Sequence, residues 1–239
     1  MKITVCGCGF LGSHVSEELA KLAFSQELLD ATFRFIDFDI WEERNAANQH
    51  VSLTEAKNGT PKAITCADYA KRYEFKAEAV MEKLTAENAE ELLEASDLVI
   101  ECLDNIPTRQ ILWGRGIGNS PCPVMHTGLS RKGDGFVNWS ASDFDTFPFK
   151  PQNLVGRTMQ EQDIKEPPCE MYKYRSNGLV LIGAIAKAAA FYLGKDPWNI
   201  LQGAEEKGIM TCWETNPTGA KLLAEDEYLV NDFFPIHQH

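Results

Sequence analysis

The sequence predicts an α/β fold: a Rossmann-like, doubly wound, mostly parallel sheet with a C-terminal crossover loop and an antiparallel extension. Short strand-like runs alternate with helical apolar spacing over the first 140 residues, which is the order of a parallel sheet with crossover helices. A glycine-rich turn lies between the first strand-like run and the first helical one. Ligands of such sheets bind at the carboxyl ends of the strands.

The first unit is a strand, a tight turn and a helix. Residues 2–6 form an apolar, β-branched run that stops at glycines, and residues 10–22 carry apolar side chains at helical spacing. A second strand, residues 33–36, ends at Asp37 and Asp39. Both carboxylates therefore belong to the ligand-binding edge of the predicted sheet.

The following elements continue the alternation. A Gly-Thr-Pro break at residues 59–61 precedes a helix, because proline suits the first helical turn. The fourth strand contains a single charge, Glu101, as expected when both faces are covered. The predicted elements are helices at residues 62–73, 87–95 and 108–116, and strands at residues 77–84, 98–103, 124–128 and 136–139.

Beyond Ser140 the composition shifts to Asp, Phe, Pro, Gln and Asn. We expect residues 141–176 to form a crossover loop with a functional role, because structureless loops of this length are uncommon. Residues 176–193 should form a helix that packs back on the core. The sequence thus divides into a first, Rossmann-like half, residues 1–140, and a second half, residues 141–239, of the same domain.

The charge of the chain excludes two classes of partner. Its 239 residues carry a formal net charge of -12, whereas nucleic acids and anionic membranes require a basic surface. The most apolar late run, residues 178–193, is interrupted by Lys187 and is too short to span a bilayer comfortably. We predict no nucleic-acid partner and no membrane partner.

Cysteine usage and the N-terminus both predict a cytoplasmic location. Met1 leads directly into a strand, without the charged and apolar regions of a signal peptide. The seven cysteines form no CxxC pair, which argues against a disulfide scaffold and a four-cysteine zinc site.

The turn after the first strand has the pattern GxGxxG, with glycines at Gly7, Gly9 and Gly12. Glycine lets the backbone approach a phosphate, and the following helix presents amide hydrogens to an anion. This motif indicates a nucleotide but does not distinguish ATP from NAD or FAD. Asp37 and Asp39 fit any of these nucleotides, since a carboxylate can accept hydrogen bonds from ribose hydroxyls. For Asp39, a helix cap or a solvated turn is an equally good explanation.

A combination of polar residues favours ATP. Asn45 and Gln49 can position phosphate or ribose oxygens, and Lys62 at a helix start can neutralise pyrophosphate. Asp104, followed by Asn105 at the end of the fourth strand, can hold magnesium. Alone, Lys62 would be interpreted as a solvated lysine and Asp104 as a helix cap. A site for hydride transfer would not need this set of polar and charged residues.

With these residues in place, the chain resembles the ThiF/MoeB/HesA family and the adenylation domains of ubiquitin-activating enzymes. The matching pieces are residues 7–13, residues 37–39 with Asn45 and Gln49, residues 59–63, residues 97–109, the glycine-rich residues 128–137, and Pro167-Pro168-Cys169. The resemblance covers nearly the whole chain. It implies a homodimeric adenylyltransferase in which the C-terminal carboxylate of a small ubiquitin-like protein or peptide attacks the α-phosphate of ATP.

The resemblance also implies roles for individual residues. Asp37 would hold the ribose, Asn45, Gln49 and Lys62 would contact phosphates, and Asp104 would organise Mg2+. In-line displacement at phosphorus depends on positioning and charge neutralisation. The implied nucleotide-binding positions are Gly7, Gly9, Gly12, Asp37, Asp39, Asn45, Asn48, Gln49, Lys62, Leu103, Asp104 and Asn105.

The chain departs from the family pattern at several points. Asn48 stands where the family places a phosphate-neutralising arginine, and Arg44 lies nearby in another register. Phe10 replaces a common glycine and is expected to crowd the phosphates. The chain begins at the first strand, without the N-terminal helices through which relatives contribute an arginine across their dimer. Without paired CxxC ligands, we expect no structural zinc.

Cys169 is the predicted nucleophile if the adenylate passes to a thiol. Activating enzymes that form thioesters carry their cysteine in this loop, and Lys165, Lys173 and Arg175 would lower the thiol pKa. A small hydrophobic residue buried under the loop is an equally good explanation.

Two other functions stay open. The missing arginine would suit a catalytically weakened partner subunit that binds nucleotide, although Lys62 and Asp104 are retained. The glycine loop and Asp37 also fit a NAD-dependent oxidoreductase.

Overall fold

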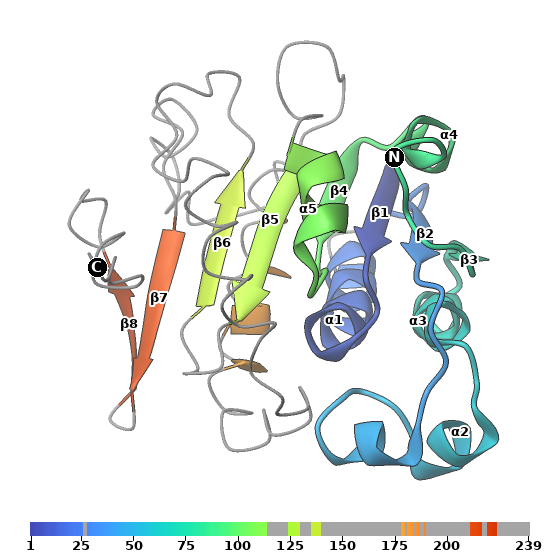
Figure 1. Cartoon of the computed structure of the whole chain (residues 1–239), viewed down its shortest axis with the longest axis horizontal. Coiled ribbons are helices and arrows are strands. Elements are labelled where there is room, and N and C mark those ends of the chain that lie inside the picture. The colour runs from blue at the N-terminus through green and yellow to red at the C-terminus, as the bar shows by residue number, and fades with distance from the viewer. Residues whose placement is uncertain are drawn as a thin grey trace.

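The structure, a computed structural model, describes residues 1–25, 28–113, 124–129, 135–139, 178–179, 181–183, 185–186, 189, 211–216 and 219–223. Its strands form one eight-stranded sheet in the order β3-β2-β1-β4-β5-β6-β7-β8 (Figure 1). The strands are β1 (Lys2–Cys6), β2 (Thr32–Ile36), β3 (Lys76–Val80), β4 (Leu98–Glu101), β5 (Val124–Leu129), β6 (Gly135–Trp139), β7 (Thr211–Asn216) and β8 (Gly219–Leu223).

Strands β1 to β5 run parallel, and β6, β7 and β8 pair antiparallel along one side. The chain leaves β1 toward β2 and β3, and later returns to the other side of β1 with β4 and β5. The order therefore reverses between β1 and β4, which is where doubly wound sheets bind ligands. The predicted Rossmann-like, mostly parallel sheet with an antiparallel extension is confirmed.

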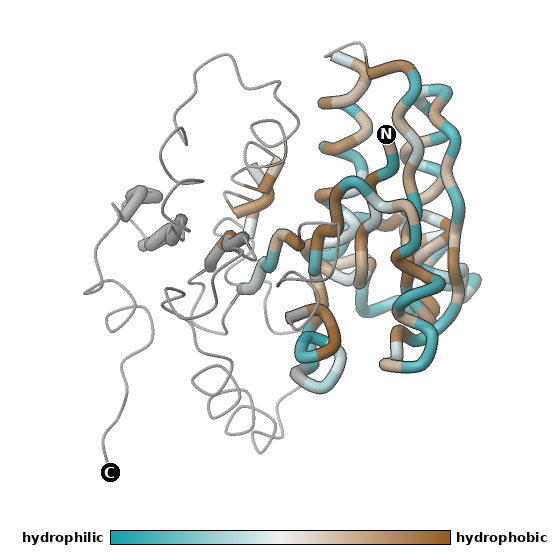
Figure 2. The backbone as a smooth tube through the Cα atoms, turned by 90° about the horizontal axis from the view of Figure 1, so that it is seen from above, coloured by the Kyte–Doolittle hydropathy of each residue, from teal (hydrophilic) through white to brown (hydrophobic). Residues whose placement is uncertain are grey.

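Helices cover both faces of the sheet. They are α1 (Phe10–Ser25), the 3-10 helix η1 (Glu43–Ala47), α2 (Leu53–Asn58), α3 (Lys62–Lys71), α4 (Ala89–Leu93) and α5 (Ile106–Trp113). One core joins the sheet to α1 and α3, and the other joins it to α4 and α5. Neighbouring residues of β1 serve opposite cores, since Val5 belongs to the first and Cys6 to the second. Apolar and polar residues alternate along the described helices, as a single buried face requires (Figure 2).

The predicted packing helix at residues 176–193 is supported where the structure describes it. Residues 178–179, 181–183, 185–186 and 189 are helical. Leu181, Ile182, Ile185 and Ala189 are buried in the core shared with α1 and α3. No helix among the described residues is long and apolar enough to cross a membrane.

Several details differ from the sequence prediction: most of the element boundaries shift by one or two residues, and three differences are described here. β3 ends at Val80 rather than at residue 84, and Leu84 instead enters the core beneath α4. Helix α5 begins two residues earlier than predicted. Helix α2 was not predicted, although Ser52 and Glu55 form a capping box at its start and Gly59 closes it at φ 65°. Residues 141–176 lie outside the described residues, so the crossover loop and the division at residue 140 stay predictions.

Candidate functional site

The glycine loop joins β1 to α1 at the point where the strand order reverses. Gly7 has φ +90°, and a Cβ there would stand 2.7 Å from the Cys102 carbonyl oxygen. A Cβ on Gly12 would stand 1.8 Å from the Gly7 carbonyl oxygen. At Gly9, by contrast, a Cβ would meet no atom of the described residues within 4 Å. Packing therefore requires Gly7 and Gly12, whereas Gly9 leaves bare backbone open to a ligand.

Asp37 is built into this loop. Its carboxylate accepts hydrogen bonds from the backbone N–H of Cys8, at 2.6 Å, and of Asp39, at 2.8 Å. Burial raises the Asp37 pKa above its ordinary value, against the lowering effect of those two hydrogen bonds. The side chain thus fixes the end of β2 against the glycine loop.

Asp39 and Lys62 lie beside it at the same edge of the sheet. The Lys62 ammonium is 3.1 Å from Asp39 Oδ2 and lies 5.6 Å from the centre of the Trp41 ring. The Lys62 side chain is 13% exposed and that of Asp39 is 49% exposed. A cation over an aromatic ring and beside one carboxylate is held in a defined position. Lys62 also begins α3, as the sequence predicted.

The segment after β2 forms a compact turn. Asn45 accepts the Glu42 N–H through Oδ1 at 2.8 Å, and its carbonyl accepts the N–H groups of Asn48 and Gln49. Asn45 and Asn48 are buried. Within the described part of the chain, Gln49 Oε1 is buried without a hydrogen-bond partner. Asn45 therefore shapes the turn, and the Gln49 amide is the group of this segment with unused hydrogen-bonding capacity.

Arg44 does not replace the arginine that the family carries at position 48. Its side chain is exposed and pairs with Glu42, with Nε 2.6 Å from Oε2. Asn48 brings no charge to the buried side of the turn.

His50 attaches this segment to two helices. Its backbone N–H donates to Ser13 Oγ at 3.1 Å, and the Tyr69 hydroxyl donates to its carbonyl. Its ring nitrogen Nε2 is 2.5 Å from Glu17 Oε2. The turn is thereby fastened to α1 directly behind the glycine loop.

A column of aromatic rings runs through the same contact. Phe10 and His14 have ring centres 5.1 Å apart, His14 and His50 also 5.1 Å, and His50 and Tyr69 4.6 Å. The Phe10 ring thus packs along α1 against His14. Sequence reasoning missed this column, because His50 and Tyr69 are distant in the chain from Phe10 and His14 and the four residues form no motif.

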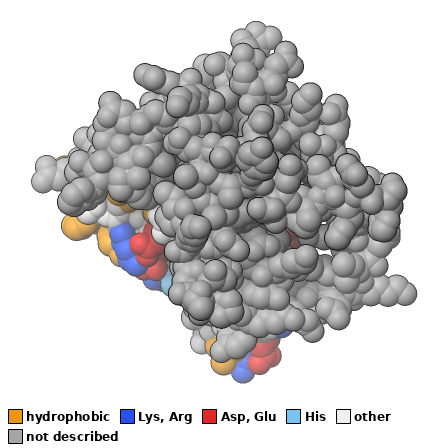
Figure 3. Space-filling model, turned by 90° about the vertical axis from the view of Figure 1, so that its left-hand side faces the viewer, with side chains coloured by type: hydrophobic (Ala, Val, Ile, Leu, Met, Phe, Trp, Pro, Cys, Tyr) orange, Lys and Arg blue, Asp and Glu red, His pale blue; other side chains and the backbone are white. Residues whose placement is uncertain are grey.

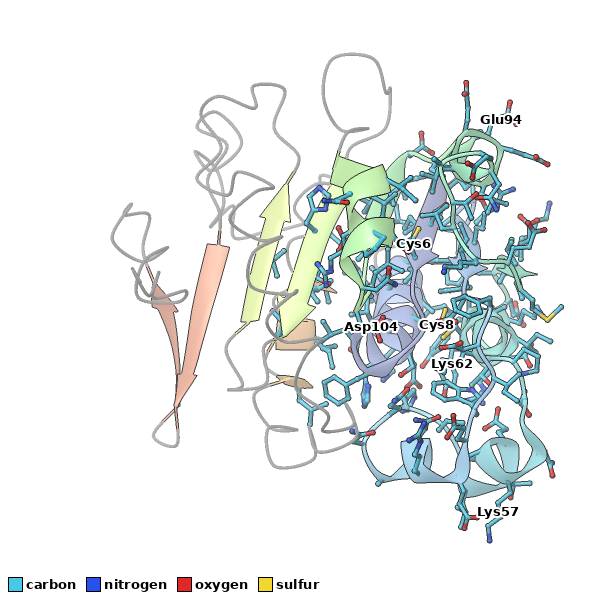
Figure 4. All side chains as sticks on the ribbon, viewed as in Figure 1. Cys6, Cys8, Lys57, Lys62, Glu94 and Asp104 are labelled. Atoms are coloured by element: carbon cyan, nitrogen blue, oxygen red, sulfur yellow. The ribbon has the colours of Figure 1, made fainter. Side chains whose placement is uncertain are left out.

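Asp104 and Asn105 follow β4 on the other side of the glycine loop. Asp104 is exposed, and Asn105 Oδ1 accepts the Thr108 N–H at 3.0 Å, which caps α5. The Leu103 carbonyl accepts a hydrogen bond from the Arg109 side chain. Figure 4 shows Asp104, Cys8 and Lys62 in one row at the lower end of β1, with Glu94 at the opposite end of the sheet.

Beneath this turn lies a buried charge network that the sequence did not predict. Glu101 binds Arg109, with Oε1 2.5 Å from Nη1, and His126, with Oε2 2.5 Å from Nδ1. The sequence marked Glu101 as the only charge of its strand. The register of β4 and β5 places Glu101 and His126 opposite each other, a pairing that only the sheet reveals.

The cysteines of the described core are reduced and largely inaccessible. Cys6, Cys8 and Cys66 are buried, and Cys102 is half-buried. Burial raises the pKa of the Cys8 thiol and raises that of Cys102 to about 12. Cys169 and its three cationic neighbours in the sequence lie outside the described residues, so its role stays a prediction.

Among the residues that the structure describes, no three His, Cys, Asp or Glu side chains could jointly hold a metal ion. Mg2+ needs no such protein cage, because it usually takes one or two carboxylates together with substrate phosphates. Asp104 is a carboxylate of the kind that could bind Mg2+ together with substrate phosphates.

In the view of Figure 3 most of the surface belongs to residues that are not described. At the lower rim of that view, basic, acidic and hydrophobic side chains of described residues lie together.

Comparison with known proteins extends this picture. Adenylyltransferase and sulfurtransferase MOCS3 of Danio rerio is 32% identical over 114 residues, which cover 47% of this chain and 23% of that protein. SAMP-activating enzyme E1 of Haloferax volcanii is 28% identical over 113 residues, covering 46% of this chain and 39% of that protein. The chain spans less than half the length of these curated relatives.

Among solved structures, E. coli MccB with AMPCPP and MccA has the same fold, with a TM-score of 0.67 at 12% sequence identity. The match covers 95% of this chain and 63% of that chain. A model described as ThiF family matches residues 1–171. Since that match takes in the glycine loop, Lys62, Asp104 and most of the 239 residues, the chain belongs to the ThiF family.

Proposed function

We propose that the chain binds ATP with Mg2+ where the strand order reverses and adenylates the C-terminal carboxylate of a small ubiquitin-like protein or peptide. The observation that carries this proposal is the open backbone at Gly9 after β1, with the Lys62 ammonium paired to Asp39 after the neighbouring strand β2 and the exposed Asp104 carboxylate after the other neighbour, β4. The names of the relatives, adenylyltransferase and E1, support it, as does the complex of MccB with AMPCPP and MccA.

The residues present fit a nucleotide. The Gly9 backbone and the start of α1 suit a phosphate, since a Cβ at Gly9 would meet no described atom within 4 Å and a helix start presents amide hydrogens to an anion. For the ribose we propose Asp39 ahead of Asp37, because both oxygens of Asp37 already accept backbone N–H groups while Asp39 is half exposed. The unpaired amide oxygen of Gln49 supports a contact with the nucleotide from the turn.

The reaction needs little covalent chemistry from the protein. An oxygen of the partner's carboxylate forms a bond to the α-phosphorus, and the bond from that phosphorus to the bridging oxygen breaks. Pyrophosphate leaves with the electron pair, and the product is an acyl-adenylate. Lys62 would stabilise the charge that develops on the phosphates, and Asp104 would hold the magnesium, which would supply further neutralisation of phosphate charge.

The chain offers little positive charge to neutralise the phosphates, because position 48 is asparagine and Arg44 pairs with Glu42. This supports the homodimer that the resemblance implies, with a second copy adding positive charge near the site. It equally favours the second candidate, a weakened subunit that needs a different partner.

The cytoplasmic location also stays a prediction.

The direct test is exchange of labelled pyrophosphate into ATP in the presence of candidate ubiquitin-like proteins and Mg2+. We expect exchange in the wild type and its loss in Asp104→Ala. The matched control is Asp68→Ala, which removes an exposed carboxylate that pairs with Lys71 on α3. ATP binding without exchange by any partner would contradict the catalytic proposal and leave the weakened subunit.

Two further measurements separate the alternatives. Titration with ATP and with NAD should show binding of ATP only, and a preference for NAD would favour an oxidoreductase. Mass spectrometry after incubation with Mg2+, ATP and partner should show whether the partner becomes attached through Cys169, as we propose for transfer to a thiol.

A further inference from the structure

The network of Glu101, Arg109 and His126 at the end of β4 places charged groups in the protein interior, where their desolvation is unfavourable. Glu101 is 0% exposed, Arg109 is 13% exposed and His126 is 6% exposed. The three residues before Glu101 in β4 are apolar and buried. Burying charged groups carries a desolvation cost that an apolar side chain of similar size avoids. Packing alone therefore gives no reason for charges at this position.

The network is connected directly to the turn that carries Asp104. Arg109 donates to the Leu103 carbonyl as well as pairing with Glu101, so its guanidinium bridges β4 and the following turn. The Arg109 backbone N–H donates to the Asn105 carbonyl at 3.2 Å. Asp104 thus lies between two residues whose carbonyls are both held by Arg109.

Strand β5 fixes the other side of Glu101. His126 binds the carboxylate, and the Thr127 hydroxyl donates to the Glu101 carbonyl at 2.6 Å. The planar guanidinium suits this arrangement because its donors point in fixed directions, which a lysine ammonium cannot reproduce. The position of the turn is thereby set by three elements, β4, β5 and α5.

We propose that Arg109 and His126 are positioning residues for Asp104. Acting through Glu101 and the Leu103 carbonyl, they hold the turn at residues 103–105 so that the Asp104 carboxylate meets the magnesium bound to ATP. This inference rests on the proposed function, since it takes Asp104 as the magnesium carboxylate. A displacement of about 1 Å at such a group can cost roughly 100-fold in rate.

The experiment compares Arg109→Gln with Arg34→Gln. Arg34 is a matched control because it is 16% exposed, pairs with Glu78 at 2.8 Å and donates to the Leu92 carbonyl at 2.6 Å, away from the site. Calorimetry measures ATP affinity with Mg2+ and with a chelator, and thermal unfolding measures stability. We expect Arg109→Gln to lose the gain in affinity that Mg2+ gives, while its magnesium-free affinity stays within about twofold of the wild type.

Exchange kinetics should separate positioning from general damage. In Arg109→Gln we expect kcat to fall roughly 100-fold, with the KM for ATP rising by no more than the lost magnesium effect on affinity. Arg34→Gln should lower the unfolding temperature and leave both kinetic constants near those of the wild type. If Arg109→Gln retains the magnesium effect and kcat, the inference is wrong.

A pair of variants at His126 tests the same idea without touching Arg109. Asparagine can place its amide nitrogen near the position of histidine Nδ1, so His126→Asn should restore most of the activity that His126→Leu loses. Equal activity of the two variants would overturn the role of His126. If Arg109→Gln does not fold, Arg109→Lys takes its place, and we expect it to fold but still to lose the magnesium effect.

The outcomes distinguish the two proposals. A wild-type protein that binds no ATP, or binds it without any effect of Mg2+, overturns the proposed site itself and the inference with it. A wild type that binds and exchanges normally, with Arg109→Gln equally active, overturns only the positioning role.

Discussion

Lys62 and Asp39 are joined twice, through a side-chain ion pair of 3.1 Å and through a hydrogen bond of 2.9 Å from the Lys62 N–H to the Asp39 carbonyl. The end of β2 and the start of α3 are therefore one unit. A cation held this way needs little reorganisation when a phosphate arrives, which is the condition under which electrostatic stabilisation is most effective.

Replacing Lys62 by methionine should reduce pyrophosphate exchange by roughly 100- to 1000-fold, the usual cost of removing one preorganised charge or donor. The methionine keeps an apolar stem against Trp41, so the fold should survive. Lys71→Met, at the other end of α3, is the control, because Lys71 pairs only with Asp68 in the contacts described. Equal rates for the two variants would show that Lys62 is a structural lysine.

The two aspartates after β2 should behave differently on substitution. Asp39→Asn removes a half-exposed carboxylate and should weaken ATP binding by about tenfold, the cost of a hydrogen bond to a charged group. Its unfolding temperature should change little. A larger loss of affinity in Asp37→Asn, without loss of stability, would return the ribose role to Asp37.

The raised pKa of Asp37 gives a pH test with a definite sign. The ordinary carboxyl pKa is 3.8 and burial raises it in the folded state, so the folded protein holds this proton more tightly than the unfolded chain does. The contribution of Asp37 is therefore fully present below about pH 3.8 and is lost as the pH rises through the folded pKa. The stability advantage of the wild type over Asp37→Asn should shrink over that window, as measured by denaturant unfolding. An advantage that grows with pH would show that the hydrogen bonds outweigh burial.

Two glycines of the same motif should give opposite phenotypes. Gly12→Ala places a methyl group 1.8 Å from the Gly7 carbonyl oxygen and should destabilise the fold by roughly 1–3 kcal/mol or more. Gly9→Ala meets no described atom within 4 Å, so it should leave the unfolding temperature near that of the wild type, yet weaken ATP binding. Calorimetry and thermal unfolding of the two variants check both parts. Normal ATP affinity in Gly9→Ala would place the nucleotide elsewhere.

Thiol labelling should spare the described core. At pH 8 in the folded protein, Cys8 and Cys102 should react with iodoacetamide far more slowly than after denaturation, because both thiols have raised pKa values and the thiolate is the reactive form. Peptide mapping by mass spectrometry measures this site by site. Rapid labelling of Cys8 would mean that the glycine loop opens in solution.

The sequence predicts local structure well where a short pattern determines it. The run of residues 2–6, the glycine turn and the helix after it form the observed β1, loop and α1, and the carboxylates after β2 lie at the predicted edge. Even α2, which was not predicted, carries its signal in Ser52 and Glu55. These features depend on neighbours within a few residues.

Contacts that depend on register could not be predicted in this way. Glu101 and His126 meet because β4 pairs with β5 at that register, and His14 meets His50 because the turn after β2 folds back on α1. The same limit applies to the different roles of Asp37 and Asp39. Their order in the chain does not show which carboxylate the glycine loop uses for its own backbone and which remains half exposed.

Strand β3 is one edge of the sheet, and its side chains limit how copies of this protein can assemble. Lys76 and Glu78 are exposed, and Ala77 and Ala79 between and beyond them are small. Charges on a short edge strand oppose the addition of another strand, which protects against aggregation through that edge. Two copies joined edge to edge at β3 would have to remove these charges from water, so a homodimer is expected to use a different surface.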